Sequence, residues 1–205
     1  MDPADNPESR GGYRKTFDQY GPSPQALQWV DYRSAALRYR QLLVDIALEG
    51  RSILDIGCGM GDLVPFIYAQ TDSFKYLGID ITPEFIEVAK KRYAGHDFKV
   101  FDPFKEDLGR TFDVVVLCGA MNANKKDWLE NRKQKIQKLY ELANEAVVFN
   151  MAGALEPIAA DERVAYADPQ EILEFCRGLS KKVILKTHYH PRDFTIVMFK
   201  QSAPE

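Results

Sequence analysis

The stretch that decides the fold is SILDIGCGMGDL, residues 52–63. Ile53, Leu54 and Ile56 form the apolar run of a β-strand that is covered on both faces. Glycine follows at alternate positions 57, 59 and 61, where the missing Cβ permits backbone angles and close approaches that other residues forbid. A strand that leads into such a turn and then a helix is typical of the ligand-binding edge of an open α/β sheet.

The spacing of the glycines indicates which ligand the turn holds. A dinucleotide fingerprint is G-x-G-x-x-G, whereas this turn reads D-x-G-x-G-x-G and begins with Asp55. A carboxylate there would repel a pyrophosphate and attract a ligand that carries an ammonium group. The pattern resembles the first motif of class I S-adenosylmethionine-dependent methyltransferases. An ordinary strand-turn-helix unit of an α/β protein is the alternative interpretation.

Composition limits the other function classes. A chain of 205 residues suits one domain with a sizeable core. The net charge of -3 gives no electrostatic reason to expect nucleic acid or an anionic membrane as a partner. Cys58, Cys118 and Cys176 have no paired spacing, so we expect reduced thiols and a cytoplasmic location. No apolar run reaches membrane-spanning length, and the acidic start with its prolines is unlike a signal peptide.

The chain divides into three parts by composition. Residues 1–12 are almost without apolar side chains, which predicts a disordered tail. Residues 13–50 should form an N-terminal helical segment that serves as a lid or a substrate wall. Ser23 and Pro24 begin its first predicted helix, and the second ends at Gly50. Residues 51–205 are the predicted methyltransferase core domain.

Strands and helices alternate through the core, which predicts a parallel sheet with helices on both faces. The expected helices cover residues 62–69, 83–93, 128–144 and 169–179. The expected strands cover residues 52–57, 76–80, 98–101, 112–118, 146–150, 182–189 and 194–200. The last two strands are too close together for a crossover helix, so the final strand must run antiparallel. The prediction is therefore a Rossmann-like, doubly wound α/β sheet of seven strands, the architecture of class I methyltransferases.

The resemblance implies S-adenosylmethionine as the cofactor and assigns residues to it. Asp55 corresponds to the first-motif acid beside the methionine part, and the turn approaches the cofactor at Gly57, Cys58, Gly59 and Gly61. Asp80 ends the second strand, where one carboxylate suits the two ribose hydroxyls. Asp102 ends the third strand, where family members bind the adenine amino group. A helix N-cap is the alternative role for each acid.

Further cofactor contacts follow from the same resemblance. Ile81, Pro103 and Phe104 would enclose the adenine ring by apolar contact. Cys118, at the end of the fourth strand, is expected to be a core thiol or a small residue beside the cofactor. Arg38, from the helix that precedes the sheet, would bind the cofactor carboxylate. A solvated surface arginine is the alternative interpretation of Arg38.

The acceptor should lie beyond the fourth strand. The sequence at its exit, residues 117–122, lacks the Asn/Asp-Pro-Pro-aromatic motif that adenine and amide N-methyltransferases carry there. It also lacks the acid cluster of metal-dependent catechol methyltransferases, so we expect no metal. The candidate substrate-binding residues are Tyr20, Trp29, Tyr32, Arg33, Asn122, Asn150 and Tyr166.

Methyl transfer requires no catalytic triad, and the sequence indicates none. The candidate catalytic residues are His188, His190 and Tyr20. His188 and His190 would lie on one face of the sixth strand, as a substrate contact or base, as metal ligands, or in hairpin packing.

The sequence thus favours an S-adenosylmethionine-dependent methyltransferase that acts on a small molecule by in-line transfer without a metal. Two alternatives stay open at this point. The first is methylation of a protein or a tRNA. The second is a domain that binds the cofactor without catalysis, as a sensor or a scaffold.

Overall fold

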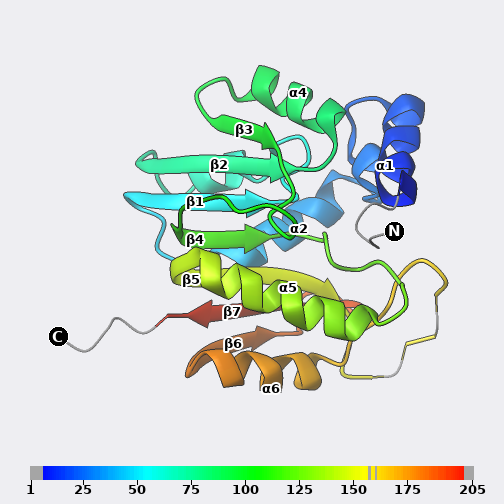
Figure 1. The fold of residues 1–205 in the computed structure, drawn as a ribbon, viewed down its shortest axis with the longest axis vertical. Helices are drawn as coiled ribbons and strands as arrows, with labels where there is room; N and C mark the ends of the chain where they lie inside the picture. Colours follow the sequence, from blue (N-terminus) through cyan, green and yellow to red (C-terminus); the bar gives the residue numbers. More distant parts are fainter. Residues whose placement is uncertain (1–6, 157, 160, 201–205) are drawn as a thin grey trace.

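The computed structural model describes residues 7–156, 158–159 and 161–200. They form one seven-stranded sheet in the order β3-β2-β1-β4-β5-β7-β6 (Figure 1). The strands are β1 (Arg51–Ile56), β2 (Phe74–Asp80), β3 (Asp97–Val100), β4 (Phe112–Leu117), β5 (Ala143–Ala152), β6 (Lys182–Lys186) and β7 (Asp193–Phe199). Neighbouring strands from β3 to β5 pair in parallel, while β7 is antiparallel to both β5 and β6. The predicted sheet with its reversed last strand is confirmed.

Helices cover both faces of the sheet. They are α1 (Pro7–Tyr20), the 3-10 helix η2 (Pro24–Leu27), α2 (Tyr32–Leu43), α3 (Val64–Tyr68), α4 (Pro83–Arg92), α5 (Trp128–Leu142) and α6 (Pro169–Leu179). Apolar side chains of α2, α3 and α4 join the core on one face. Those of α5 and α6 join the core on the other face. No helix of the described residues is long and apolar enough to cross a membrane.

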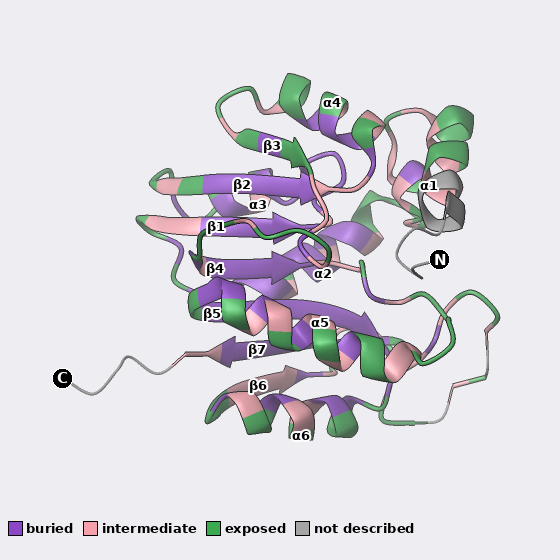
Figure 2. Cartoon of the chain, viewed as in Figure 1, coloured by how far each residue is buried: buried purple, intermediate pink, exposed green. Residues whose placement is uncertain are grey.

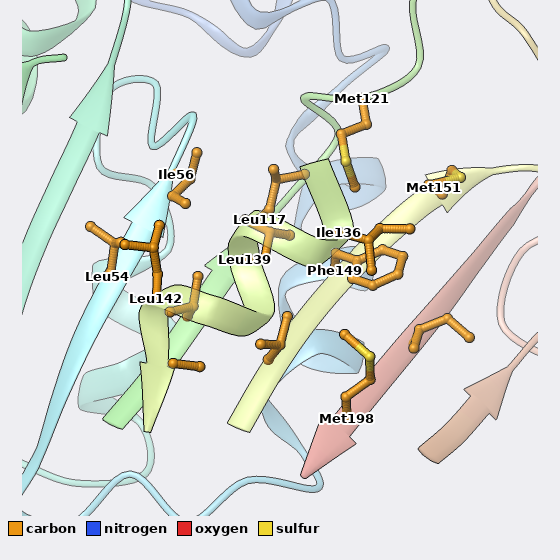
Figure 3. Close-up of a cluster of buried hydrophobic side chains, with 14 of the residues drawn as sticks. Leu54, Ile56, Leu117, Met121, Ile136, Leu139, Leu142, Phe149, Met151 and Met198 are labelled. Atoms are coloured by element: carbon orange, nitrogen blue, oxygen red, sulfur yellow. The ribbon is translucent and has the colours of Figure 1, made fainter. Parts of the chain in front are cut away.

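The central strands are buried on both faces, as their continuous apolar runs predict (Figure 2). Under α5, for example, Ile136 and Leu139 contact a cluster that includes Leu117 and Phe149 (Figure 3). All four side chains are fully buried. This packing fixes the carboxyl ends of β1, β4 and β5 relative to one another.

The direction of chain winding reverses at β1, which lies between β2 and β4. Open α/β sheets bind ligands outside the carboxyl ends of the strands at such a switch point. The turn after β1 is held against β2, because the amides of Gly57 and Cys58 both donate to the carbonyl of Ile79, at 2.8 and 3.0 Å. Helix α1 lies beside this same edge of the sheet (Figure 1).

The structure corrects three predicted boundaries. Helix α1 begins at Pro7, so residues 7–12 do not belong to the predicted tail, while residues 1–6 lie outside the described part. Proline suits the first turn of a helix, and the packing of Tyr13 and Phe17 supports the turns before them. The helix predicted from Pro24 is one 3-10 turn, after which Asp31 caps α2. The sixth strand ends at Lys186 rather than residue 189, because the chain turns before Pro191.

Candidate functional site

The glycine turn after β1 requires residues without a Cβ. Gly57, Gly59 and Gly61 all have positive φ angles, of +72°, +54° and +81°. A Cβ at Gly57 would lie 2.8 Å from the Cβ of Ala120, in the loop after β4. A Cβ at Gly59 would lie 2.7 Å from a methyl carbon of Leu27. The turn is therefore closely covered by two other segments of the chain, and glycine is needed on both steric and conformational grounds.

Asp80 lies at the carboxyl end of β2 and supports the glycine turn. Its carboxylate accepts the amide of Gly59 at 3.0 Å and the amide of Thr82 at 2.8 Å. Burial raises its pKa, and these backbone hydrogen bonds oppose the rise. Asp80 thus lies beside the turn, as predicted. It also binds the amide of Thr82, the residue before α4, which is part of the helix N-cap role given as the alternative.

Asp55 is the second-last residue of β1, and its contact with the methionine part of the cofactor stays a prediction. The side chain is almost fully buried and accepts the Tyr76 hydroxyl at 2.7 Å. Burial raises its pKa to about 7, the hydrogen bond from Tyr76 lowers it, and the nearby charges of Asp80 and Asp62 raise it. The carboxyl group therefore titrates near neutral pH within the edge where the cofactor motif was predicted.

The predicted adenine side follows β3. The Asp102 carboxylate accepts the amide of Phe104 at 3.1 Å, which forms the turn after the strand. Pro103 is buried, while Ile81, Asp102 and Phe104 are half-buried. Pro103 and Phe104 line a surface groove of about 400 Å³ against α5. The four residues therefore lie at one end of the carboxyl edge, as the order of the strands requires.

Residues 13–31, which we call the N-terminal strap, lie over the glycine turn. The rings of Tyr13 and Phe17 contact Phe85 of α4 edge-on, each with centroids 5.8 Å apart. The Thr16 hydroxyl donates to the carbonyl of Ala26 at 2.8 Å and so joins α1 to η2. Burial raises the pKa of Tyr13 to about 12, with a smaller contribution from the charge of Asp80. The strap thus extends from the Asp80 end of the edge to the turn that Leu27 covers.

Trp29 continues the strap towards the end of β4. Its ring atoms lie 3.1 Å from the position of a Cβ at Gly119. The guanidinium of Arg38 lies over the ring, 4.9 Å from its centroid. Trp29 therefore lies at the predicted substrate side, packed between α2 and the loop after β4.

Arg38 is buried and forms an ion pair with Asp193 at the start of β7. Its other terminal nitrogen donates to the carbonyl and the hydroxyl of Ser34, each at 2.7 Å. Arg38 is thus not the solvated arginine of the alternative interpretation. The structure gives it a partner within the protein, on the β5-β7 half of the edge, and the predicted contact with the cofactor carboxylate stays a prediction.

Asn122 and Asn150 join the end of β4 to β5 in a reciprocal way. The Asn150 carbonyl oxygen accepts the amide of Gly119 at 2.6 Å, and that of Asn122 accepts the amide of Ala152 at 2.9 Å. Asn150 is completely buried and Asn122 half-buried. Both residues therefore have structural contacts at the predicted substrate wall.

The two candidate histidines lie in the turn between β6 and β7, not on a strand face, which corrects their predicted placement. His188 is exposed, whereas His190 is half-buried with Nδ1 2.9 Å from the Asp193 carboxylate. Burial lowers the pKa of His190, and the Asp193 charge opposes this. Within the described residues, no group of three or more His, Cys, Asp or Glu side chains could hold a metal ion.

The other predicted substrate residues lie less centrally. Tyr20 and Tyr32 are about half exposed, at 48% and 54%, and Arg33 is also exposed. Tyr166 is half-buried in the loop between β5 and α6. The structure therefore brings Trp29, Asn122 and Asn150 together near the end of β4. It leaves Tyr20, Tyr32 and Arg33 on the surface.

The cysteines at the edge are core thiols. Cys58 is buried and Cys118 half-buried, and burial raises the pKa of both thiols well above the ordinary value. Such thiols are poor nucleophiles at neutral pH. This agrees with the core-thiol interpretation of Cys118, while its place beside the cofactor stays a prediction.

Four residues of the site were missed by the sequence reasoning: Tyr13, Leu27, Asp193 and Arg132. Arg132 is 1% exposed and donates to the carbonyls of Met121, at 2.6 Å, and Ala165, at 2.7 Å. It so joins the loops that follow β4 and β5. No local pattern indicates these contacts, because each joins segments that only the tertiary fold brings together.

Comparison with known proteins agrees with this geometry. Residues 54–147 match the family model of a methyltransferase domain. The Mycobacterium tuberculosis protein Rv1506c, which is named as a methyltransferase, is 29% identical over 162 residues, or 76% of this chain and 97% of its own length. These matches support the prediction of a class I S-adenosylmethionine-dependent methyltransferase.

Solved structures share the fold of this methyltransferase at low sequence identity. One is the magnesium protoporphyrin IX methyltransferase of Synechocystis with bound S-adenosylmethionine, with a TM-score of 0.60 and 16% identity. The match covers 80% of this chain and 76% of that one. Another is the DhpI-SAM-HEP complex, with a TM-score of 0.69, 16% identity, and coverage of 96% and 98%.

Proposed function

We propose that this methyltransferase transfers the methyl group to a small-molecule acceptor by in-line displacement and without a metal ion. The observation that carries the proposal is the N-terminal strap, which covers the carboxyl edge with Leu27 on Gly59 and Trp29 against Gly119. A small ligand can be enclosed under such a cover. A folded RNA or protein substrate would need an open groove there.

Charge and the related folds support a small acceptor. The net charge of -3 offers no attraction for a polyanion. The Synechocystis protein with the same fold is named for a porphyrin, which is a small molecule. The free cysteines favour the reducing cytoplasm as the place of action.

The residues at the edge support binding of S-adenosylmethionine, the cofactor that structures with the same fold contain. The glycine turn approaches without side chains, and Asp80 presents a carboxylate beside it, so we assign the turn to the methionine part and Asp80 to the ribose. Asp102, Ile81, Pro103 and Phe104 follow β2 and β3 and would enclose the adenine. Once bound, S-adenosylmethionine supplies an activated methyl carbon.

The protein's task is then positioning, which can lower a barrier by about 7–11 kcal/mol. A general base is needed only for an acceptor that enters protonated. Of the three candidates, His188 and Tyr20 lie on the surface, whereas His190 is fixed beside Asp193 at the substrate half. His190 is therefore the candidate that the geometry favours for that role.

Transfer of tritium from methyl-labelled S-adenosylmethionine tests the proposal. The protein is incubated with a cell extract, and macromolecules are then precipitated with acid. The proposal predicts label in the acid-soluble fraction as a new compound. Precipitated label would support a protein or tRNA acceptor, and cofactor binding without any transfer would support a sensor.

A further inference from the structure

Several buried polar atoms have no partner among the described residues, and two of them are nitrogen donors near the start of β7 and the end of β5: Nε of Arg38 and Nδ2 of Asn150. Arg38 is 6% exposed and Asn150 is 0% exposed. The other polar atoms of both side chains are bonded, Arg38 to Ser34 and Asp193 and Asn150 to Gly119. An unpaired buried donor costs about 1–3 kcal/mol, so two of them in one region need a physical reason.

The two donors lie on the same face of the sheet. Asn150 of β5 is directly opposite Thr195 of β7, and Asp193, the partner of Arg38, stands two residues before Thr195. Residues opposite each other in an antiparallel pair share a face, as do residues two apart on one strand. Asn150 and Asp193 therefore both point to the side that α2 covers.

Trp29 lies over Arg38 and over Gly119, the residue that Asn150 binds. Gly119 is followed by Ala120, which contacts the glycine turn at Gly57. The region beneath Trp29 thus adjoins the predicted cofactor turn on its substrate side.

The charges around the two donors balance. The Arg38 cation is paired with the Asp193 carboxylate, and burial favours the neutral form of His190 beside them. Burial raises the pKa of the nearby Cys118 thiol; the charges of Asp55 and Asp193 raise it further, and that of Arg38 lowers it. A carboxylate ligand would add an uncompensated buried charge here, which argues against the predicted contact of Arg38 with the cofactor carboxylate, whereas an uncharged oxygen would accept from both donors at no such cost.

We propose that Arg38 Nε and Asn150 Nδ2 bind an uncharged carbonyl oxygen of the methyl acceptor when Trp29 moves aside. This subsite deepens the proposed function and rests on it. It would fix the acceptor by two hydrogen bonds beside the glycine turn, and it makes carbonyl-bearing small molecules the expected substrate class.

Nuclear magnetic resonance of the side-chain N–H groups tests the subsite directly. The 15N-labelled protein, saturated with S-adenosylhomocysteine, is titrated separately with acetophenone, benzoate and benzylamine at millimolar concentration. We expect acetophenone to shift the Arg38 Nε and Asn150 Nδ2 signals together with the Trp29 indole signal. The proposal is overturned if benzylamine or benzoate shifts these signals as much, or if no probe shifts them.

Matched variants locate the effect. Asn150→Leu should weaken acetophenone binding about five- to tenfold, the expected loss of one hydrogen bond. Asn144→Leu, at the exposed opposite end of β5, should not. Arg38→Lys, which keeps the charge beside Asp193 but has no Nε–H, is the second variant and should weaken binding similarly.

Binding of S-adenosylhomocysteine, measured on the same samples, separates the two proposals. If it fails in the wild type, the cofactor assignment behind the proposed function fails. If S-adenosylhomocysteine still binds, and Asn150→Leu and Arg38→Lys bind acetophenone as the wild type does, only the subsite is wrong.

Discussion

Asp80 is the residue on which the cofactor assignment depends most. Its carboxylate is fixed by the amides of Gly59 and Thr82, which leaves it oriented at the end of β2. We expect Asp80→Ala to weaken S-adenosylhomocysteine binding about 10- to 100-fold, since hydrogen bonds to a charged group contribute about 1.5–3 kcal/mol. Isothermal calorimetry measures this. Asp97→Ala, at an exposed position of β3, is the control, and equal affinities in both variants would contradict the assignment.

Asp55 makes a prediction about pH. Its pKa is raised by burial from 3.8 to about 7, so between these values the folded state holds a proton that the unfolded state has released. Stability therefore falls as pH rises through this window and levels off above it. From about pH 5 to about pH 8 the wild type should lose about 2–3 kcal/mol more unfolding free energy than Asp55→Asn. Urea unfolding of both proteins measures the difference, and parallel pH profiles would refute it.

At this scale the sequence identifies residue types but not their partners. Asp55 and Asp80 lie at the carboxyl ends of β1 and β2, as the apolar runs before them predict. The hydrogen bond of Asp55 to Tyr76 and the ion pair of Arg38 with Asp193 do not, since these residues are 21 and 155 positions apart. Local patterns carry no information about such distant pairs.

Among the elements, the N-terminal strap is the one that we propose as the cover of the site. Phe17 anchors α1 on Phe85 by an edge contact, which contributes about 0.5–1.5 kcal/mol. Phe17→Ala should speed tryptic cleavage after the exposed Arg14 and Lys15 about 3- to 10-fold. Asp18→Ala, an exposed change on the same helix, should leave the rate unchanged. Equal rates for the two variants would show that Phe17 does not hold the strap.

The central strands could be predicted because they are buried apolar runs, as residues 112–117 illustrate. The N-terminal elements could not be predicted as well. The first turns of α1 have no apolar period, and η2 owes its place to Leu27 and Ala26, which pack against tertiary neighbours such as Met60 and Phe85. Tertiary packing rather than local propensity decides these segments.

In the whole molecule, two ion pairs connect the N-terminal segment to the last strands, and the pair of Arg38 with Asp193 is buried. Arg38 of α2 pairs with Asp193 of β7, and Lys186 of β6 with Asp45 just after α2, at 2.6 Å. Asp193→Ala leaves a buried unpaired cation and should lower the unfolding free energy by about 3–5 kcal/mol. Glu145→Ala, which removes an exposed pair with Arg51, should cost less than about 1 kcal/mol. Denaturant unfolding compares them, and similar losses would contradict this role of the buried pair.

The central claim is that the carboxyl edge of β1 and β2 holds S-adenosylmethionine beneath the strap. Calorimetric titration of the full chain with S-adenosylhomocysteine tests it most directly. The structure predicts saturable one-to-one binding, accompanied by slower tryptic cleavage at Arg14 and Lys15. Neither heat nor a thermal shift at millimolar S-adenosylhomocysteine would contradict the claim.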